Sequence, residues 1–247
     1  MLRIAFDLDG VLADMEGELA RHAEALFGER AVRPREEPAA GERTAPVDDA
    51  PAAGDAAPAD DGTPVPVSLN INARQTRRLW DHVQGIENFW ETLAEIEPGT
   101  IARLAAVASE RRWEVIFLTK RPRSAGSTAQ VQTQRWLESK GFTLPSVFVV
   151  QGSRGRIAAA LALDVVVDDR PENCLDVVVD STARAILVWR SATERVPSAS
   201  QRLGIGVVKS VAECLDVLAE VDRPTREQPG LMSRVKRALG LNETTSA

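Results

Sequence analysis

Apolar and polar positions follow two rhythms along this chain. Short apolar runs are separated by longer stretches in which apolar residues recur three or four positions apart. The short runs are typical of buried strands and the longer spacing of helices. Strands are predicted at 2–6, 113–118, 146–150, 164–167, 184–189 and 205–208, and helices at 14–27, 73–83, 87–93, 100–111, 127–140, 157–163 and 211–221. This alternation predicts an α/β fold with a parallel sheet covered by helices on both faces.

Residues 31–67 interrupt the pattern. They are mostly Ala, Pro, Gly and acidic residues, without an aromatic residue. A segment with so little to bury cannot offset the entropy cost of ordering, so we expect a disordered insertion, and a solvated spacer is favoured over a docking arm. The predicted organisation is a core of residues 1–14 and 98–222, a helical module of residues 15–97, and a C-terminal tail, 223–247. The tail carries a short basic amphipathic helix, which is expected to pack on its own domain or to fray rather than to bind a partner or a membrane surface.

Charge narrows the choice of partners. Of the net charge of −6, −5 comes from eight acidic residues and three arginines within 31–67, so the remainder is close to neutral. Such a chain has no basic field with which to recruit a nucleic acid polymer. No apolar stretch approaches the ~20 residues needed to span a bilayer. The apolar run that begins at Leu2 leaves no room for a signal peptide.

Cysteine and histidine are scarce. Cys174 and Cys214 stand alone, without metal-type spacing, which indicates free thiols in a reducing compartment. His22 and His82 are expected to be polar helix residues rather than ligands. We therefore expect a soluble, cytoplasmic protein, and the sequence is compatible with a homodimer.

Two aspartates follow the first strand. Side chains on a strand alternate between its faces, so Asp7 and Asp9 point the same way and Leu8 points into the core. Two adjacent carboxylates repel each other unless a cation lies between them or they share a proton. Mg²⁺, which prefers oxygen ligands, fits that requirement. The alternative is a surface turn that carries two aspartates by chance, since Asp-Gly is a common turn pair.

Three later strands also end at polar or charged residues. Their polar residues are Thr119, Lys120 and Arg121, then Ser153 and Arg154, then Asp168 and Asp169. The carboxyl ends of parallel strands form one edge of a sheet, where α/β proteins bind ligands. Carboxylates, a hydroxyl group and cations at four strand ends favour a site for a metal–phosphate complex over a chance turn.

These motifs resemble those of the haloacid dehalogenase-like superfamily of phosphotransferases. The stretch 7–11 (DLDGV) is similar to its first motif, Thr119 to the second, Arg154 to the third and 168–169 to the fourth. Residues 6–14 (FDLDGVLAD), 88–90 (NFW) and 166–173 (VVDDRPEN) also resemble the 5′(3′)-deoxyribonucleotidase branch. The resemblance covers residues 1–14 and about 98–190. It implies a Rossmann-like, three-layer core with a small helical cap, residues 15–97, inserted after the first strand.

The resemblance also implies catalytic and metal-binding roles. Asp7 would attack phosphorus and form an aspartyl-phosphate. Asp9 would protonate the leaving group and then activate water. Mg²⁺ would be held by Asp7, the backbone carbonyl of Asp9, Asp168 and Asp169.

Phosphate-binding and substrate-binding roles follow in the same way. Thr119, Lys120 and Arg154 would contact the phosphoryl oxygens, although Arg154 stands where Lys is commoner in the family. Lys120 and Arg121 are also departures, because both stand where the nucleotidase branch has smaller residues. Phe89 and Trp90, in the cap, would either stack on a flat substrate group or form the small core of the cap.

The implied function is a Mg²⁺-dependent phosphomonoesterase acting on a small phosphorylated substrate, a (deoxy)nucleoside monophosphate. Two alternatives stay open. One is the same chemistry on another phosphoester, such as a sugar phosphate. The other is a catalytically silent binding protein that keeps the fold.

Overall fold

The computed structural model describes residues 1–32, 69–191 and 196–222. Residues 33–67 of the predicted insertion lie outside these ranges, and so does the whole of the predicted tail, 223–247. Within the described ranges, no helix combines the length and the apolar character that crossing a bilayer requires.

The centre of the molecule is a six-stranded sheet with the order β3-β2-β1-β4-β5-β6. All five neighbouring pairs are parallel, and the first strand lies at the centre, between β2 and β4. The strands are β1 (Arg3–Asp7), β2 (Glu114–Thr119), β3 (Ser146–Val149), β4 (Val165–Asp168), β5 (Arg184–Val188) and β6 (Gly206–Val208). The predicted parallel sheet is therefore confirmed, and Asp7, Thr119 and Asp168 each stand at the last position of a strand.

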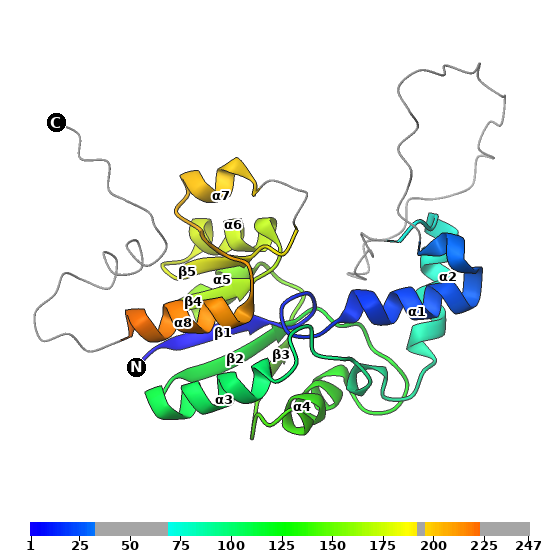
Figure 1. The fold of residues 1–247 in the computed structure, drawn as a ribbon, viewed down its shortest axis with the longest axis horizontal. Coiled ribbons are helices and arrows are strands. Elements are labelled where there is room, and N and C mark those ends of the chain that lie inside the picture. Colours follow the sequence, from blue (N-terminus) through cyan, green and yellow to red (C-terminus); the bar gives the residue numbers. More distant parts are fainter. Residues whose placement is uncertain (33–68, 192–195, 223–247) are drawn as a thin grey trace, which may run out of the picture.

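Helices cover both faces of this sheet. Alternating residues of β1 face opposite layers: Ile4 and Phe6 join one apolar cluster, and Ala5 joins the other. The first cluster includes residues of α3 (Thr100–Arg111), α4 (Ala129–Ser139) and α8 (Val211–Val221), whereas the second includes residues of α5 (Arg154–Ala160) and α6 (Pro171–Asp180). A short helix, α7 (Ser198–Arg202), precedes β6. The arrangement is the predicted three-layer α/β fold (Figure 1).

Two helices beside the site differ from the prediction. Helix α5 begins at Arg154 instead of residue 157, because the Ser153 hydroxyl accepts a hydrogen bond from the Arg156 amide and caps the helix. Helix α6 was not predicted at all. Its run of valines, 177–179, has strand-like composition, but Pro171 at the first helical position favours a helix start.

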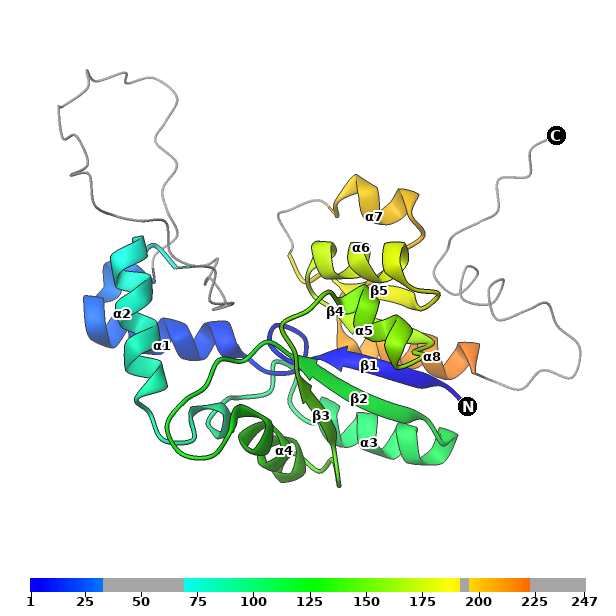
Figure 2. The ribbon, with the colours of Figure 1, turned by 180° about the vertical axis from the view of Figure 1, so that it is seen from behind.

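The helical module lies beyond the carboxyl end of β1, away from the sheet (Figures 1 and 2). It contains α1 (Met15–Phe27), the 3₁₀ turn η1 (Glu29–Ala31) and α2 (Ala73–Gln84). The Asn70 amide donates to the Ala31 carbonyl over 2.9 Å, so the two ends of the insertion meet. His22 of α1 and His82 of α2 also meet, with Nδ1 and Nε2 3.2 Å apart.

The last part of the predicted cap packs on the core instead. The predicted helix at 87–93 is wrong in type: it is a 3₁₀ turn, η2 (Phe89–Glu91), preceded by Asn88 in the left-handed region (φ 53°). Trp136 of α4 donates from Nε1 to the Leu93 carbonyl over 2.7 Å, and Trp90 donates from Nε1 to the Pro122 carbonyl over 2.9 Å. The Trp90 amide also donates to Gln132 Oε1 of α4 over 3.0 Å, so η2 is held against α4.

Close packing of α5 on α6 gives a test of this fold. A Cβ atom at Gly155 would overlap the backbone carbonyl of Asp176, whereas Gly152 has open space around the same position. We expect Gly155→Ala to lower the free energy of unfolding by about 1–3 kcal/mol, because a backbone obstacle cannot move aside cheaply. Gly152→Ala, the matched control, should stay within about 0.5 kcal/mol of the parent. Chemical denaturation measures both, and equal stabilities would contradict the α5–α6 packing.

Candidate active site

The loop after β1 is a tight turn built on one carbonyl. The Leu8 carbonyl accepts hydrogen bonds from the amides of Val11, Leu12 and Ala13 at 3.3, 2.8 and 2.8 Å. Gly10 adopts φ +89°, and a Cβ there would overlap the carboxylate of Asp169. Glycine is needed at this position both for its backbone conformation and for this close approach.

Asp7 lies beside a buried arginine. Arg154, in the first turn of α5, donates from Nη2 to Asp7 Oδ1, and its Nε lies 3.6 Å from Asp168 Oδ2. Both Arg154 and Asp7 are buried, at 2% and 8% exposure. Burial, followed by the negative charge of Asp168, raises the pKa of Asp7 well above its usual range, although Arg154 acts in the opposite direction.

Two further carboxylates follow β4. Asp168 is fully buried and accepts hydrogen bonds from Asn173 Nδ2 at 3.0 Å and from the Arg170 amide at 2.9 Å. Burial raises the pKa of Asp168, and burial together with the charge of Asp168 raises the pKa of Asp169 to about 7. Asp169 Oδ1 is buried and has no hydrogen-bond partner within the described chain.

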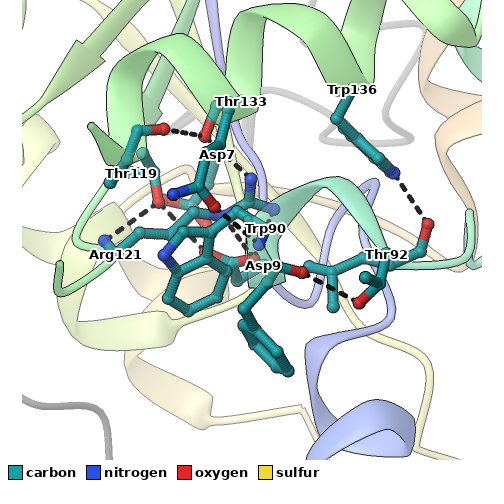
Figure 3. Close-up of polar contacts among 12 residues, drawn as sticks. Asp7, Asp9, Trp90, Thr92, Thr119, Arg121, Thr133 and Trp136 are labelled. Carbon is teal, nitrogen blue, oxygen red and sulfur yellow. Dashed lines mark hydrogen bonds and ion pairs between the residues drawn. The ribbon is translucent and has the colours of Figure 1, made fainter. Parts of the chain in front are cut away.

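Asp9 is held by β2 rather than by the residues around Asp7. Thr119 Oγ1 donates to Asp9 Oδ2 over 3.0 Å (Figure 3). Arg121 donates from Nε to both Asp9 oxygens over 3.0 Å and from Nη2 to Oδ1 over 2.8 Å. The two aspartates of the first motif therefore have different partners, Arg154 for Asp7 and Arg121 for Asp9.

A third arginine supports the loop from outside. Arg190, just after β5, donates from Nη1 to the Gly10 carbonyl over 2.6 Å and from Nη2 to the Val11 carbonyl over 3.0 Å. Its Nη2 also lies 2.7 Å from Glu97. Burial acts to raise the pKa of Glu97, but hydrogen bonds from Arg190 and from the backbone amides of Val211 and Ala212 outweigh it, so the pKa is lowered.

The structure thus brings most of the predicted site residues to one edge of the sheet. Asp7, Asp9, Thr119, Arg154, Asp168 and Asp169 meet there through the contacts above. Lys120 is half-buried and makes no hydrogen bond or ion pair with the described residues. Phe89 and Trp90 are completely buried and contact each other edge to face, with ring centroids 4.9 Å apart. Their burial favours the small-core interpretation over stacking on a substrate.

Some of these functional contacts were not assigned from the sequence. Arg121, Asn173 and Arg190 each bind a backbone or carboxylate group of the motif loops. Arg121 had a usable signal, because it follows Thr119 by two positions, the same spacing that relates Asp7 to Asp9. Arg190 had none, since its target lies about 180 residues away in the sequence.

The carboxylates fit a divalent cation chemically. Asp7, Asp168 and Asp169 are all oxygen donors, which suit Mg²⁺, and the two buried carboxylates, Asp7 and Asp168, already outnumber the single positive charge of Arg154. Asp169 Oδ1 accepts no hydrogen bond from the described residues, and a bound cation would supply its missing partner. Within the described ranges, no three acidic, histidine or cysteine side chains already converge as a metal site. A cation here would therefore use backbone, water or phosphate oxygens as well.

Comparison with known proteins identifies the fold. No protein-family model matches the chain, and no curated protein matches it. Among solved structures, a Thermotoga maritima protein provisionally named a β-phosphoglucomutase is 20% identical, with a TM-score of 0.50 over 90% of this chain and 100% of that one. A HAD family hydrolase from Deinococcus radiodurans, solved with bound phosphate and sodium, is 17% identical, with a TM-score of 0.51 over 88% of this chain and 95% of that one. At these identities the likeness shows that the chain shares the fold of these proteins.

The raised pKa values predict how stability changes with pH. A folded-state pKa above the unfolded value means that the folded protein binds more protons, so stability falls as pH rises from about 4 through about 7. In EDTA we expect the free energy of unfolding to decline between about pH 4 and about pH 7, the unfolded and folded pKa values of Asp169. The slope is about 1.4 kcal/mol per pH unit for each proton that the folded protein holds and the unfolded chain has lost. Denaturant titrations across that range measure the decline.

The Asp169→Asn variant should flatten this decline, because the amide cannot ionise. Asp216→Asn is the matched control: Asp216 lies on the exposed side of α8, in an ion pair with Arg103. It should leave the decline unchanged. Stability that rises with pH in EDTA, or an equal slope in the parent and the Asp169 variant, would contradict the electrostatic description of the site.

Proposed function

We propose that this protein is a Mg²⁺-dependent phosphomonoesterase of the haloacid dehalogenase-like superfamily, working through an aspartyl-phosphate on Asp7. One observation carries the proposal. Asp7 is a buried carboxylate beside Arg154, whose Nε and Nη1 atoms are buried and have no hydrogen-bond partner among the described residues. Such donors are costly to leave unpaired, and a bound phosphoryl group would satisfy them.

The chemistry divides into two steps. In the first, an Asp7 oxygen bonds to phosphorus while the bond from phosphorus to the leaving oxygen breaks, and Asp9 gives that oxygen its proton. In the second, the Asp9 carboxylate removes a proton from water, whose oxygen bonds to phosphorus. The acyl-phosphate bond then breaks, which releases inorganic phosphate and restores Asp7.

The surrounding residues would bind charge that builds on the phosphoryl oxygens. Arg154 would hold these oxygens, Thr119 would join it by turning its hydroxyl proton from Asp9 to the phosphoryl group, and Lys120 would extend the positive side of the site. Mg²⁺, held by Asp7, the Asp9 carbonyl, Asp168 and Asp169, would offset the repulsion between carboxylate and phosphate when bound. Asn173 and the Arg170 amide would keep Asp168 oriented toward the site.

The proposed substrate is a nucleoside monophosphate, on the strength of the resemblance to the deoxyribonucleotidase branch. The complete burial of Phe89 and Trp90 favours the second candidate, a sugar phosphate, because neither ring is available to stack on a base. We also place the protein in the cytoplasm, a reducing compartment, since Cys174 and Cys214 are both buried, free thiols.

The proposal is tested by phosphate release from a panel of nucleoside monophosphates and sugar phosphates, with Mg²⁺ and with EDTA. We expect release that requires the metal. The Asp7→Asn variant should lose it by roughly a thousandfold or more, because the amide is not a competent nucleophile. The preferred substrate decides between the two candidates.

Asp216→Asn serves again as the control and should retain activity within about twofold, since it alters an exposed carboxylate that pairs with Arg103 and with no residue of the site. A variant at Asp7 as active as the parent would rule out the aspartyl-phosphate. A parent that releases no phosphate from any substrate would favour a catalytically silent binding protein.

A further inference from the structure

Two arginines are buried at this edge of the sheet, and they differ in one respect. Arg154 has two buried nitrogens without hydrogen-bond partners in the described chain. Arg121 uses all three types of guanidinium nitrogen: Nε and Nη2 bind Asp9, and Nη1 donates to Thr133 Oγ1 over 2.9 Å. Arg154 is therefore equipped to meet a ligand, whereas Arg121 is committed to the protein.

The surroundings of Arg121 keep its guanidinium in one place. Its carbon Cζ lies 4.9 Å from the centroid of the Trp90 ring and 5.6 Å from that of the Trp136 ring. Thr133 is itself fixed, because its hydroxyl donates to the Ala129 carbonyl over 2.7 Å. Elements β2, α4 and η2 thus all contribute to the position of a single charged group (Figure 3).

The fixed guanidinium of Arg121 binds the carboxylate of Asp9. Both of its oxygens accept hydrogen bonds from Arg121, and Thr119 donates to one of them. The Asp9 side chain is 12% exposed, so it can still meet a water molecule or a substrate, while the Arg121 side chain is completely buried. A planar guanidinium that binds both carboxylate oxygens fixes the plane as well as the position of that carboxylate.

We propose that Arg121 is a positioning residue for Asp9, which orients this carboxylate to activate the water that hydrolyses the aspartyl-phosphate. Arg121 touches neither substrate nor the reacting atoms, and it acts through Asp9. The inference rests on the proposed function, because it assumes that Asp7 carries the phosphoryl group. It assigns the arginine to the second chemical step, in which a misoriented base slows hydrolysis after the ester bond has already broken.

The test uses p-nitrophenyl phosphate, whose leaving group departs without a proton from Asp9. For Arg121→Met we expect kcat to fall about tenfold or more while kcat/KM, which reports the first step, stays within about threefold. Rapid mixing should then show a burst of p-nitrophenol of up to one equivalent. Acid-quenched protein should carry the added mass of one phosphoryl group. Arg121→Lys, which keeps the charge but not the planar fork, should fall between the parent and Arg121→Met.

Two variants guard against loss of folding. Thr133→Val removes the partner of Arg121 Nη1, together with the bond from the Thr133 hydroxyl to the Ala129 carbonyl within α4, and should produce a smaller decrease in kcat in the same direction. Arg135→Met changes a half-exposed arginine on the same helix, where it pairs with Glu91, and should leave both constants unchanged. Circular dichroism before and after heating checks that each variant is folded.

The outcomes distinguish a failure of the positioning role of Arg121 from a failure of the proposed phosphatase function. If the parent releases no p-nitrophenol and no phosphate from the substrate panel, the proposed function fails and Arg121 has no such role. If the parent is active but kcat and kcat/KM fall equally in folded Arg121 and Thr133 variants, without a burst, the phosphatase proposal stands and the positioning role is wrong. Unchanged constants in those variants would overturn it as well.

Discussion

Negative charge in the interior is the constraint on which this end of the molecule depends. Asp7 and Asp168 are buried, and Asp169, which is partly exposed, has one buried oxygen. Burial is the main reason that the pKa values of all three are raised, and the negative charge of Asp168 raises those of Asp7 and Asp169 further. Removing a carboxylate from water is costly unless hydrogen bonds or positive charge compensate for it. One buried arginine, Arg154, meets two of these carboxylates, and the third retains an unpartnered oxygen. The negative charge that remains uncompensated favours the binding of a cation at this edge of the sheet.

The arginines that support the loop after β1 follow other strands of the sheet. Arg121 follows β2, Arg190 follows β5, and each reaches the loop after β1 across more than a hundred residues of sequence. The loop turns on the Leu8 carbonyl, but Arg121 orients the Asp9 carboxylate and Arg190 binds the backbone carbonyls of Gly10 and Val11. The site geometry is therefore a property of the assembled sheet, and the parallel order of the strands is what brings the charges into register.

This dependence explains what could be predicted from the sequence. Strand ends were identifiable because the apolar runs stop at polar residues, and parallel pairing then places Asp7, Thr119 and Asp168 at one edge. The partners of those side chains were not identifiable, since Arg121 binds Asp9 only because α4 and η2 close around it. The fold class followed from local patterns. Which of the two buried arginines binds Asp7 and which binds Asp9 could be learned only from the three-dimensional contacts.

The aromatic residues near the site illustrate the same distinction. Rings close to a phosphate-binding motif suggest a platform for a base, yet Trp90 and Trp136 lie against the Arg121 guanidinium and donate hydrogen bonds to backbone carbonyls of the protein. A tryptophan suits this role because its face attracts a cation while its indole N–H fixes the ring. Aromatic composition therefore reports here on how the Asp9 carboxylate is supported. Under the proposed function, selectivity among phosphoesters would come from other surfaces, and α1 and α2, which extend beyond the end of β1, are candidates to provide it.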